Sequence, residues 1–102
     1  MIPHLDGCIG LVCSHFSLPV EEFSSSHSFE ELETALTKII NNLLDQDMNR
    51  LINACYKIDL GEQVFNDIIS REEPSAIAST LAKTIIAREL LKVKTRAAYK
   101  NK

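Results

Sequence analysis

Two histidines and two cysteines lie within twelve residues near the start of the chain, at His4, Cys8, Cys13 and His15. Imidazole nitrogens and thiolates are the ligands of a tetrahedral structural zinc site. The spacing matches no common zinc finger, in which cysteines about two to four residues apart form a knuckle and a distant pair completes the site. The apolar residues between the cysteines favour a segment that packs on the rest of the protein. We therefore predict no metal and no other cofactor, with a zinc site as the alternative.

The candidate nucleophiles lack groups that would activate them. Ser14 and Ser26 each precede a histidine, but a catalytic pair needs a hydrogen bond in space, an orienting third group and an oxyanion site. Cys55 falls on the apolar face of a predicted helix, and no histidine follows His27 to serve as its base. Acidic pairs in the sequence fit the ends of helices, where carboxylates stabilise free backbone N–H groups. We predict no catalytic residues and no enzymatic activity.

Charge is divided unevenly along the chain. Residues 1–82 carry four Lys and Arg against thirteen Asp and Glu, a net charge of −9, whereas residues 83–102 carry seven against one, a net charge of +6. Residues four apart share one face of a helix, which aligns the cations of the last predicted helix. The candidate partner-binding residues are Arg88, Lys92, Lys94, Arg96, Tyr99 and Lys100.

This basic helix end has three interpretations. Cations stabilise a helix C-terminus, where carbonyl groups lack partners and the macrodipole is negative, and a charged tail also promotes solubility. The same face fits an acidic protein surface, which includes the body of a second copy. It also fits nucleic acid, since cations neutralise phosphates and Tyr99 can stack on an unpaired base. We favour the structural interpretation of the charges and rank a protein partner above a nucleic acid.

Helical periodicity extends through residues 28–96. Ser28 and Glu31 form a candidate capping box, Asp47 is a candidate N-cap, and Asp59 with Glu62 forms a second candidate capping box. Apolar residues recur at steps of three and four after each of these signals. The predicted helices cover approximately residues 28–45, 47–58, 59–71 and 74–96.

Residues 1–27 have a different character. They hold two of the three glycines, two of the three prolines, all three histidines and a run of three serines, which together predict an irregular N-terminal arm and linker. Within them, residues 8–13 are consistent with a short strand or an extended piece. Residues 97–102 are predicted to be a frayed basic tail. At 102 residues the chain is the size of one domain, an all-α bundle of about four helices.

Targeting signals are absent from the start of the sequence. A secretory signal has positively charged residues before its apolar run, but no Lys or Arg precedes the apolar residues 8–13. That run is also too short to cross a bilayer. Three cysteines fit reduced thiols better than a disulfide framework. We predict a cytoplasmic protein that does not associate with membranes.

Two stretches, LINACYKIDL at residues 51–60 and LAKTIIARELLK at residues 81–92, resemble small uncharacterised bacterial all-α proteins with no assigned activity. The resemblance covers residues 28–96 and implies a helical fold, with no site to carry over. Tyr56, Lys57 and Asp59, within the first stretch, are interpreted as residues that fix a turn, with a surface binding patch as the alternative.

The predicted function is that of a small protein-interaction, regulatory or assembly module without catalytic activity. A chain of this size buries a modest fraction of its surface, so self-association, for example as a homodimer, is one way to bury more. The alternative is a nucleic-acid-associated protein that uses the basic C-terminal helix. No small-molecule substrate is indicated.

Overall fold

Five α-helices and one 3-10 turn make up the computed structural model, which describes residues 2–100 and the side chains of residues 2–99. The elements are α1 (Leu5–Phe16), η1 (Val20–Phe23), α2 (Phe29–Gln46), α3 (Met48–Ile58), α4 (Glu62–Arg71) and α5 (Ile77–Lys100). No strand occurs in the described residues, so the predicted all-α class is confirmed. None of the helices in this part of the chain combines the length and the apolar composition needed to cross a bilayer.

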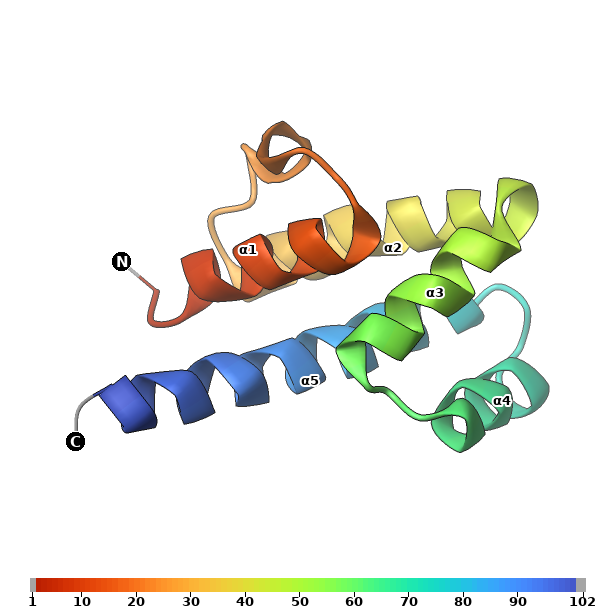
Figure 1. Cartoon of the computed structure of the whole chain (residues 1–102). Coiled ribbons are helices and arrows are strands. Elements are labelled where there is room, and N and C mark those ends of the chain that lie inside the picture. The colour runs from red at the N-terminus through yellow and green to blue at the C-terminus, as the bar shows by residue number, and fades with distance from the viewer. Residues whose placement is uncertain (1, 101–102) are drawn as a thin grey trace.

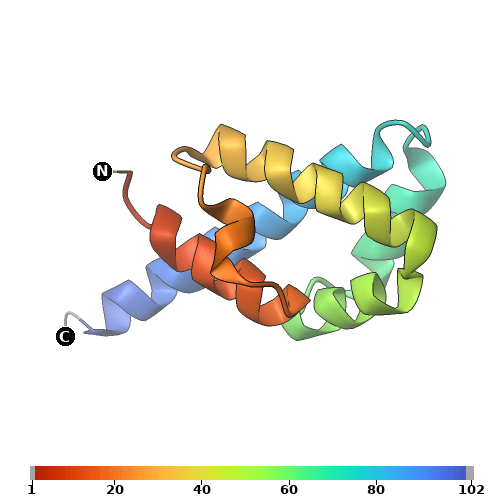
Figure 2. The same cartoon turned by 90° about the horizontal axis from the view of Figure 1, so that it is seen from above.

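Helix α5 is the element on which the other four helices pack. In Figure 1, α1 and α2 lie above α5, α3 descends toward its middle, and α4 lies beside its first half. The view from above shows α5 crossing under α2 with its first half and under α1 with its second half (Figure 2). The first turn of α1 and the last turns of α5 therefore lie at the same end of the molecule.

The structure replaces much of the predicted N-terminal arm with a core helix. Leu5, Cys8, Val12 and Phe16 are spaced three or four apart along α1, and each side chain is buried. Packing in the core offsets the low helix propensity of glycine, which costs about 1 kcal/mol per residue relative to alanine. Residues 8–13 are helical and are neither a strand nor an extended piece, and α1 packs on α3 and α5 as part of the same folded unit.

Two of the three predicted helix caps are confirmed. The Ser28 hydroxyl accepts a hydrogen bond from the Glu31 N–H at 3.1 Å, and the Glu31 carboxylate accepts one from the His27 N–H at 3.2 Å. The Asp47 carboxylate accepts a hydrogen bond from the Arg50 N–H at 3.2 Å. These interactions are local, so they follow directly from residue types at fixed spacing.

The third predicted cap, a capping box at Asp59, is wrong. Asp59 has a φ of 64° and ends α3, because its N–H and that of Leu60 donate to the carbonyls of Tyr56 and Cys55 in a Schellman turn. Gly61, with a φ of 92°, then precedes α4 without a side-chain cap. Asp59 and Gly61, both with positive φ, lie between α3 and α4. In a capping box, Asp59 would instead have an extended conformation.

The apolar stripes predicted for α2 and α5 form the centre of the core. The buried side chains of these two helices are Leu32, Leu36, Ile40, Leu43, Ala78, Leu81, Ala82, Ile85, Ile86 and Glu89. Helix α4 is different, since none of its side chains is fully buried and Phe65 and Ile68 contact the core only partly. Helix α5 continues to Lys100, so residues 97–100 are helical where a frayed tail was predicted. Residues 101 and 102 of that tail lie outside the described residues.

Candidate functional site

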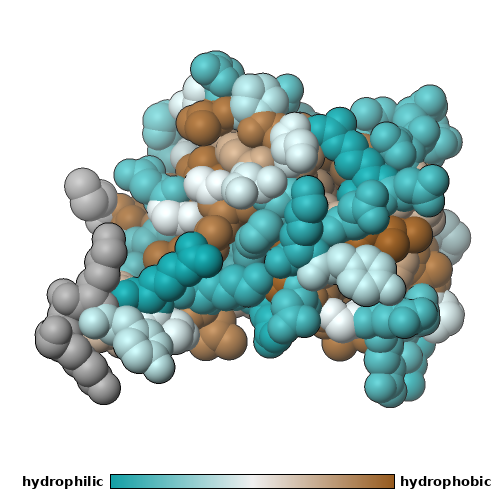
Figure 3. Space-filling view, in the orientation of Figure 1, coloured by the Kyte–Doolittle hydropathy of each residue, from teal (hydrophilic) through white to brown (hydrophobic). Residues whose placement is uncertain are grey.

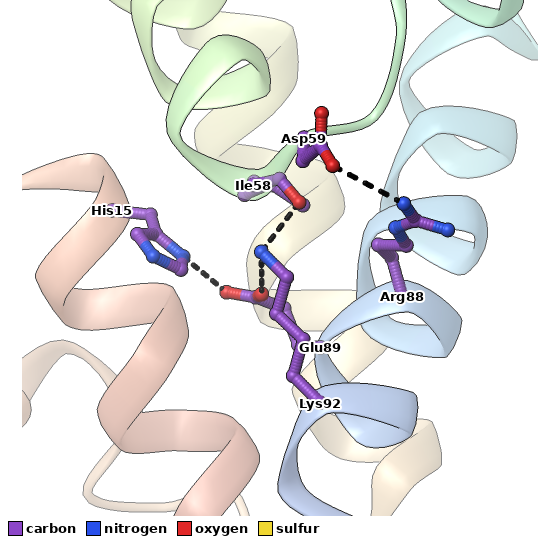
Figure 4. Close-up of polar contacts among 6 residues, drawn as sticks. All are labelled: His15, Ile58, Asp59, Arg88, Glu89 and Lys92. Carbon is purple, nitrogen blue, oxygen red and sulfur yellow. Dashed lines mark hydrogen bonds and ion pairs between the residues drawn. The ribbon is translucent and has the colours of Figure 1, made fainter. Parts of the chain in front are cut away.

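Two of the predicted partner-binding cations fasten α5 to the end of α3. The Arg88 Nη2 atom lies 3.5 Å from the Asp59 Oδ2 atom, and the Lys92 ammonium donates a hydrogen bond to the Ile58 carbonyl (Figure 4). Ile58 is the last residue of α3, where carbonyl groups have no partner within the helix. Cations at a helix C-terminus were expected for electrostatic reasons. Here the stabilised C-terminus is that of α3, and the cations belong to α5.

The other predicted residues lie in the last two turns of α5. Lys94, Arg96 and Tyr99 are exposed, Tyr99 to 74%. Lys100 is the last residue of the helix, and its side chain lies outside the described part of the chain. A shallow groove, which we call the α5 groove, runs along this helix and is lined by Arg88, Leu91, Lys92, Thr95 and Arg96. Leu91 is 56% exposed there, so an apolar side chain lies among three cations.

Glu89 of α5 has a fully buried carboxylate. The Glu89 Oε2 atom is 2.6 Å from the His15 Nδ1 atom, and its Oε1 atom is 3.7 Å from the Lys92 Nζ atom (Figure 4). The Oε1 atom has no hydrogen-bond partner. A buried carboxylate is costly unless partners offset its lost hydration, and His15 and Lys92 supply those partners. The cluster joins α1 to α5 and, through Lys92, to the end of α3.

Sequence reasoning did not identify Glu89 or its pairing with His15. A signal was present, because Glu89 falls in register with Ile85, Ile86 and Val93 on the buried stripe of α5. A carboxylate at a core position implies a buried partner. His15 was considered only as a zinc ligand, because its partner Glu89 lies 74 residues away in the sequence.

The four candidate zinc ligands do not converge. His15 is bonded to Glu89, Cys8 and Cys13 are buried along α1, and His4 precedes that helix with a φ of 66°. Among the described residues, no three His, Cys, Asp or Glu side chains are arranged to hold a metal ion. Burial, with a smaller contribution from the Glu89 carboxylate, raises the pKa of Cys8 to about 11, so its metal-binding thiolate is scarce at neutral pH.

A pocket of about 220 Å³ lies between α3 and α4. This α3–α4 pocket is lined by Ile52, Cys55, Tyr56, Asp59, Gly61, Glu62, Phe65 and Asn66. Cys55 lies on the predicted apolar face of α3, and burial raises the pKa of its thiol to about 11, so it is neutral. Tyr56 is 70% exposed, while the carboxylates of Asp59 and Glu62 add negative charge to an otherwise mainly apolar pocket. In Figure 3, hydrophobic surface is visible among hydrophilic side chains over α3 and α4.

The α3–α4 pocket and the α5 groove adjoin each other. Asp59 lines the pocket, Arg88 lines the groove, and the ion pair between these two residues joins them. Of the three residues considered as a binding patch, Tyr56 and Asp59 line the pocket, whereas Lys57 is exposed and does not. One continuous surface thus combines an acidic, largely apolar pocket with a basic groove that presents a leucine.

Comparison of the chain with family models, with curated proteins and with solved structures gives no match. The bacterial resemblance of residues 51–60 and 81–92 therefore gains no support from these comparisons. The geometry offers a pocket and a groove on α3, α4 and α5, and Arg88 and Lys92 join α5 to the end of α3.

Proposed function

We propose that this chain is a protein-interaction module without catalytic activity, and that its working surface is the α3–α4 pocket together with the α5 groove. One observation carries the proposal: an apolar pocket with an exposed tyrosine on its lining adjoins a groove in which Leu91 is 56% exposed. Exposed aromatic and aliphatic side chains beside a pocket are typical of protein interfaces, where a few buried anchors supply most of the binding energy.

The environments of the nucleophilic side chains support a role other than catalysis. Burial raises the pKa of all three cysteines, and the charges of Glu21 and Glu22 add to this effect at Cys13. Thiols in this state are poor nucleophiles at neutral pH. His15, the only histidine on α1, is held by the Glu89 carboxylate. All three thiols are free, which supports our proposal of a reducing compartment such as the cytoplasm.

The contacts of the basic face favour a protein partner over a nucleic acid. Arg88 and Lys92 contact Asp59, Glu89 and the Ile58 carbonyl, so two of the predicted phosphate-binding cations already have acceptors within the chain. The neighbouring pocket carries the carboxylates of Asp59 and Glu62, which would repel a phosphate backbone. An apolar side chain next to cations also matches the centre of a protein interface better than a phosphate-binding strip.

Site-specific photo-crosslinking in the native cell tests this proposal. A benzophenone amino acid is placed at Tyr56, at Leu91 or, as the control, at Val20, which is 63% exposed in η1 at the opposite edge of the molecule. We expect discrete protein adducts from positions 56 and 91 that survive nuclease treatment and are absent from position 20. The identified partner is then titrated with the purified chain, and Leu91→Asp is expected to weaken binding at least tenfold, about 1.4 kcal/mol.

Two results would overturn the proposal. Equal adducts from all three positions would indicate unspecific contact. Adducts that vanish on nuclease treatment, with retention on nucleic acid that falls steeply with salt, would make the basic helix a nucleic-acid surface.

A further inference from the structure

The two halves of the candidate surface are complementary to each other. The α3–α4 pocket has room for an apolar side chain and carries Asp59 and Glu62. The α5 groove presents Leu91 at 56% exposure with cations on both sides of it. Each half therefore offers the chemistry that the other half would bind.

Only part of this complementarity is satisfied within one chain, where Arg88 of the groove pairs with Asp59 of the pocket. Helix α5 is continuous from Ile77 to Lys100, and Leu91 lies three residues beyond Arg88 along it. Leu91 lines the α5 groove and is not among the residues that line the pocket, and the helical backbone between Arg88 and Leu91 fixes its position. The continuing half of α5 is seen in Figure 1 passing beyond the end of α3. Leu91 can therefore enter an α3–α4 pocket only when that pocket belongs to another molecule.

We propose that this molecule is a second copy of the same chain, related by a two-fold axis that passes close to the Arg88–Asp59 ion pair. In this arrangement Leu91 of each copy enters the α3–α4 pocket of the other, and Arg96 of each copy approaches Glu62 of the other. The inference rests on the proposed function and names the partner of that same surface. A two-fold axis at the boundary closes the assembly at two copies, because every contact between pocket and groove is then made twice.

The charges of the chain agree with this pairing. The charged residues that line the pocket are acidic, Asp59 and Glu62, whereas those that line the groove are basic, so the groove of one copy meets carboxylates of the other. Complementary charges across an interface fix its register and raise the association rate, while the desolvated apolar anchor supplies affinity. We expect the dimer to weaken when salt screens the contacts between Glu62 and Arg96.

Analytical ultracentrifugation of the purified full chain over a range of concentrations measures the dimer directly. Leu91→Asp is expected to raise the dimer dissociation constant at least tenfold. Val20→Asp introduces the same charge at a similarly exposed apolar residue outside the surface, and we expect it to leave the dissociation constant unchanged. Far-UV circular dichroism of each variant verifies the fold.

A charge exchange tests the symmetry itself and does not depend on Leu91. Glu62→Lys and Arg96→Glu are each expected to weaken their own homodimer at least fivefold, because each places like charges opposite one another twice. In an equimolar mixture of these two variants, one of the two contacts pairs the introduced lysine with the introduced glutamate, and the other pairs the native Glu62 with the native Arg96. We therefore expect the mixture to form a heterodimer about as tightly as the unaltered chain, with the mass of two copies and nothing larger.

Several outcomes would overturn the dimer. The unaltered chain could sediment as a monomer at every concentration, or its dimer could ignore both Leu91→Asp and the charge exchange. An assembly that grows with concentration beyond two copies would refute the two-fold axis. None of these results refutes the proposed function, because photo-crosslinking to a different protein at positions 56 and 91 would still support it. Loss of those adducts would refute the function independently of the sedimentation result.

Discussion

Helix α1 approaches α5 closely at Gly7 but not at Gly10, so we expect alanine to have different effects on stability at these two glycines. A Cβ atom added at Gly7 would lie 2.9 Å from one Val93 methyl carbon and 3.2 Å from the other. A Cβ atom added at Gly10 would meet no atom within 4 Å. Both glycines lie inside α1, so alanine improves helix propensity at each. Only Gly7→Ala must also shift a side chain of another helix, that of Val93 on α5.

The expected effects have opposite signs. Gly10→Ala should stabilise the protein by about 0.5–1 kcal/mol, which is the usual gain in a helix interior. At Gly7 this gain is outweighed, because valine is stiff at χ1 and overpacking costs about 1–3 kcal/mol. We therefore expect Gly7→Ala to destabilise the protein by about 1 kcal/mol net, which is about 4–8 °C in Tm for a domain of this size.

Urea and thermal unfolding followed by circular dichroism measure both variants. Val93→Ala removes the two methyl carbons concerned, so in the double variant the methyl group that Gly7→Ala adds has room. We expect a coupling energy of about 1–2 kcal/mol in favour of the double variant. If Gly7→Ala is as stabilising as Gly10→Ala, or if its cost is the same with and without Val93, the close packing of α1 on α5 is not what the structure indicates.

Three further predictions concern the interior. Arg50 donates hydrogen bonds to the Phe16 and Ser17 carbonyls at 2.8–3.1 Å, so Arg50→Ala should cost about 1.5–3 kcal/mol in urea unfolding, and an Arg50→Lys variant of equal stability to the parent would contradict this. His15→Leu should lower the free energy of unfolding by about 3 kcal/mol, because it leaves the buried Glu89 with Lys92 as its single charged partner. Adding Glu89→Leu to this variant should restore most of the stability. A double variant no more stable than His15→Leu would argue against a buried charge pair. Burial raises the pKa of Cys8 and Cys55 from 9.0 to about 11, so these thiols ionise at lower pH in the unfolded chain than in the folded protein. The free energy of unfolding should therefore fall as pH rises from 9 to 11, by on the order of 2 kcal/mol per cysteine. Cys8→Ala or Cys55→Ala should flatten this slope, and a slope unchanged by both would refute the assignment.

Local signals explain why most helices could be predicted from the sequence. Ser28 and Asp47 cap helices through contacts only three residues long, and the stripe of α2 needs no knowledge of its partner. Helix α1 was missed because its evidence is tertiary. Gly7 and Gly10 lower its propensity, and what retains the helix is the burial of Cys8 and its neighbours together with the room that Gly7 gives to Val93.

The candidate site, too, could be predicted from the sequence only in part. The basic face of α5 could be predicted, because residues four apart align on a helix whatever surrounds it. The contacts of Arg88 and Lys92 could not be predicted, since their acceptors at Asp59 and Ile58 are distant from them in the sequence. The pocket depends on the turn at Asp59 and Gly61, where left-handed backbone replaces the predicted capping box.

Helix α4 forms the more weakly held wall of the α3–α4 pocket. It has no fully buried side chain, and its pocket-facing Phe65 is only half-buried, so little apolar area holds this helix on the body. Regions with few buried contacts open at lower free energy than the core. An apolar side chain that enters the α3–α4 pocket would bury Phe65 further, so it would stabilise α4 and the complex with the same contacts. The end of α3, by contrast, is held by the hydrogen bond from Lys92 to the Ile58 carbonyl, so the two walls of the pocket differ in how firmly they are held.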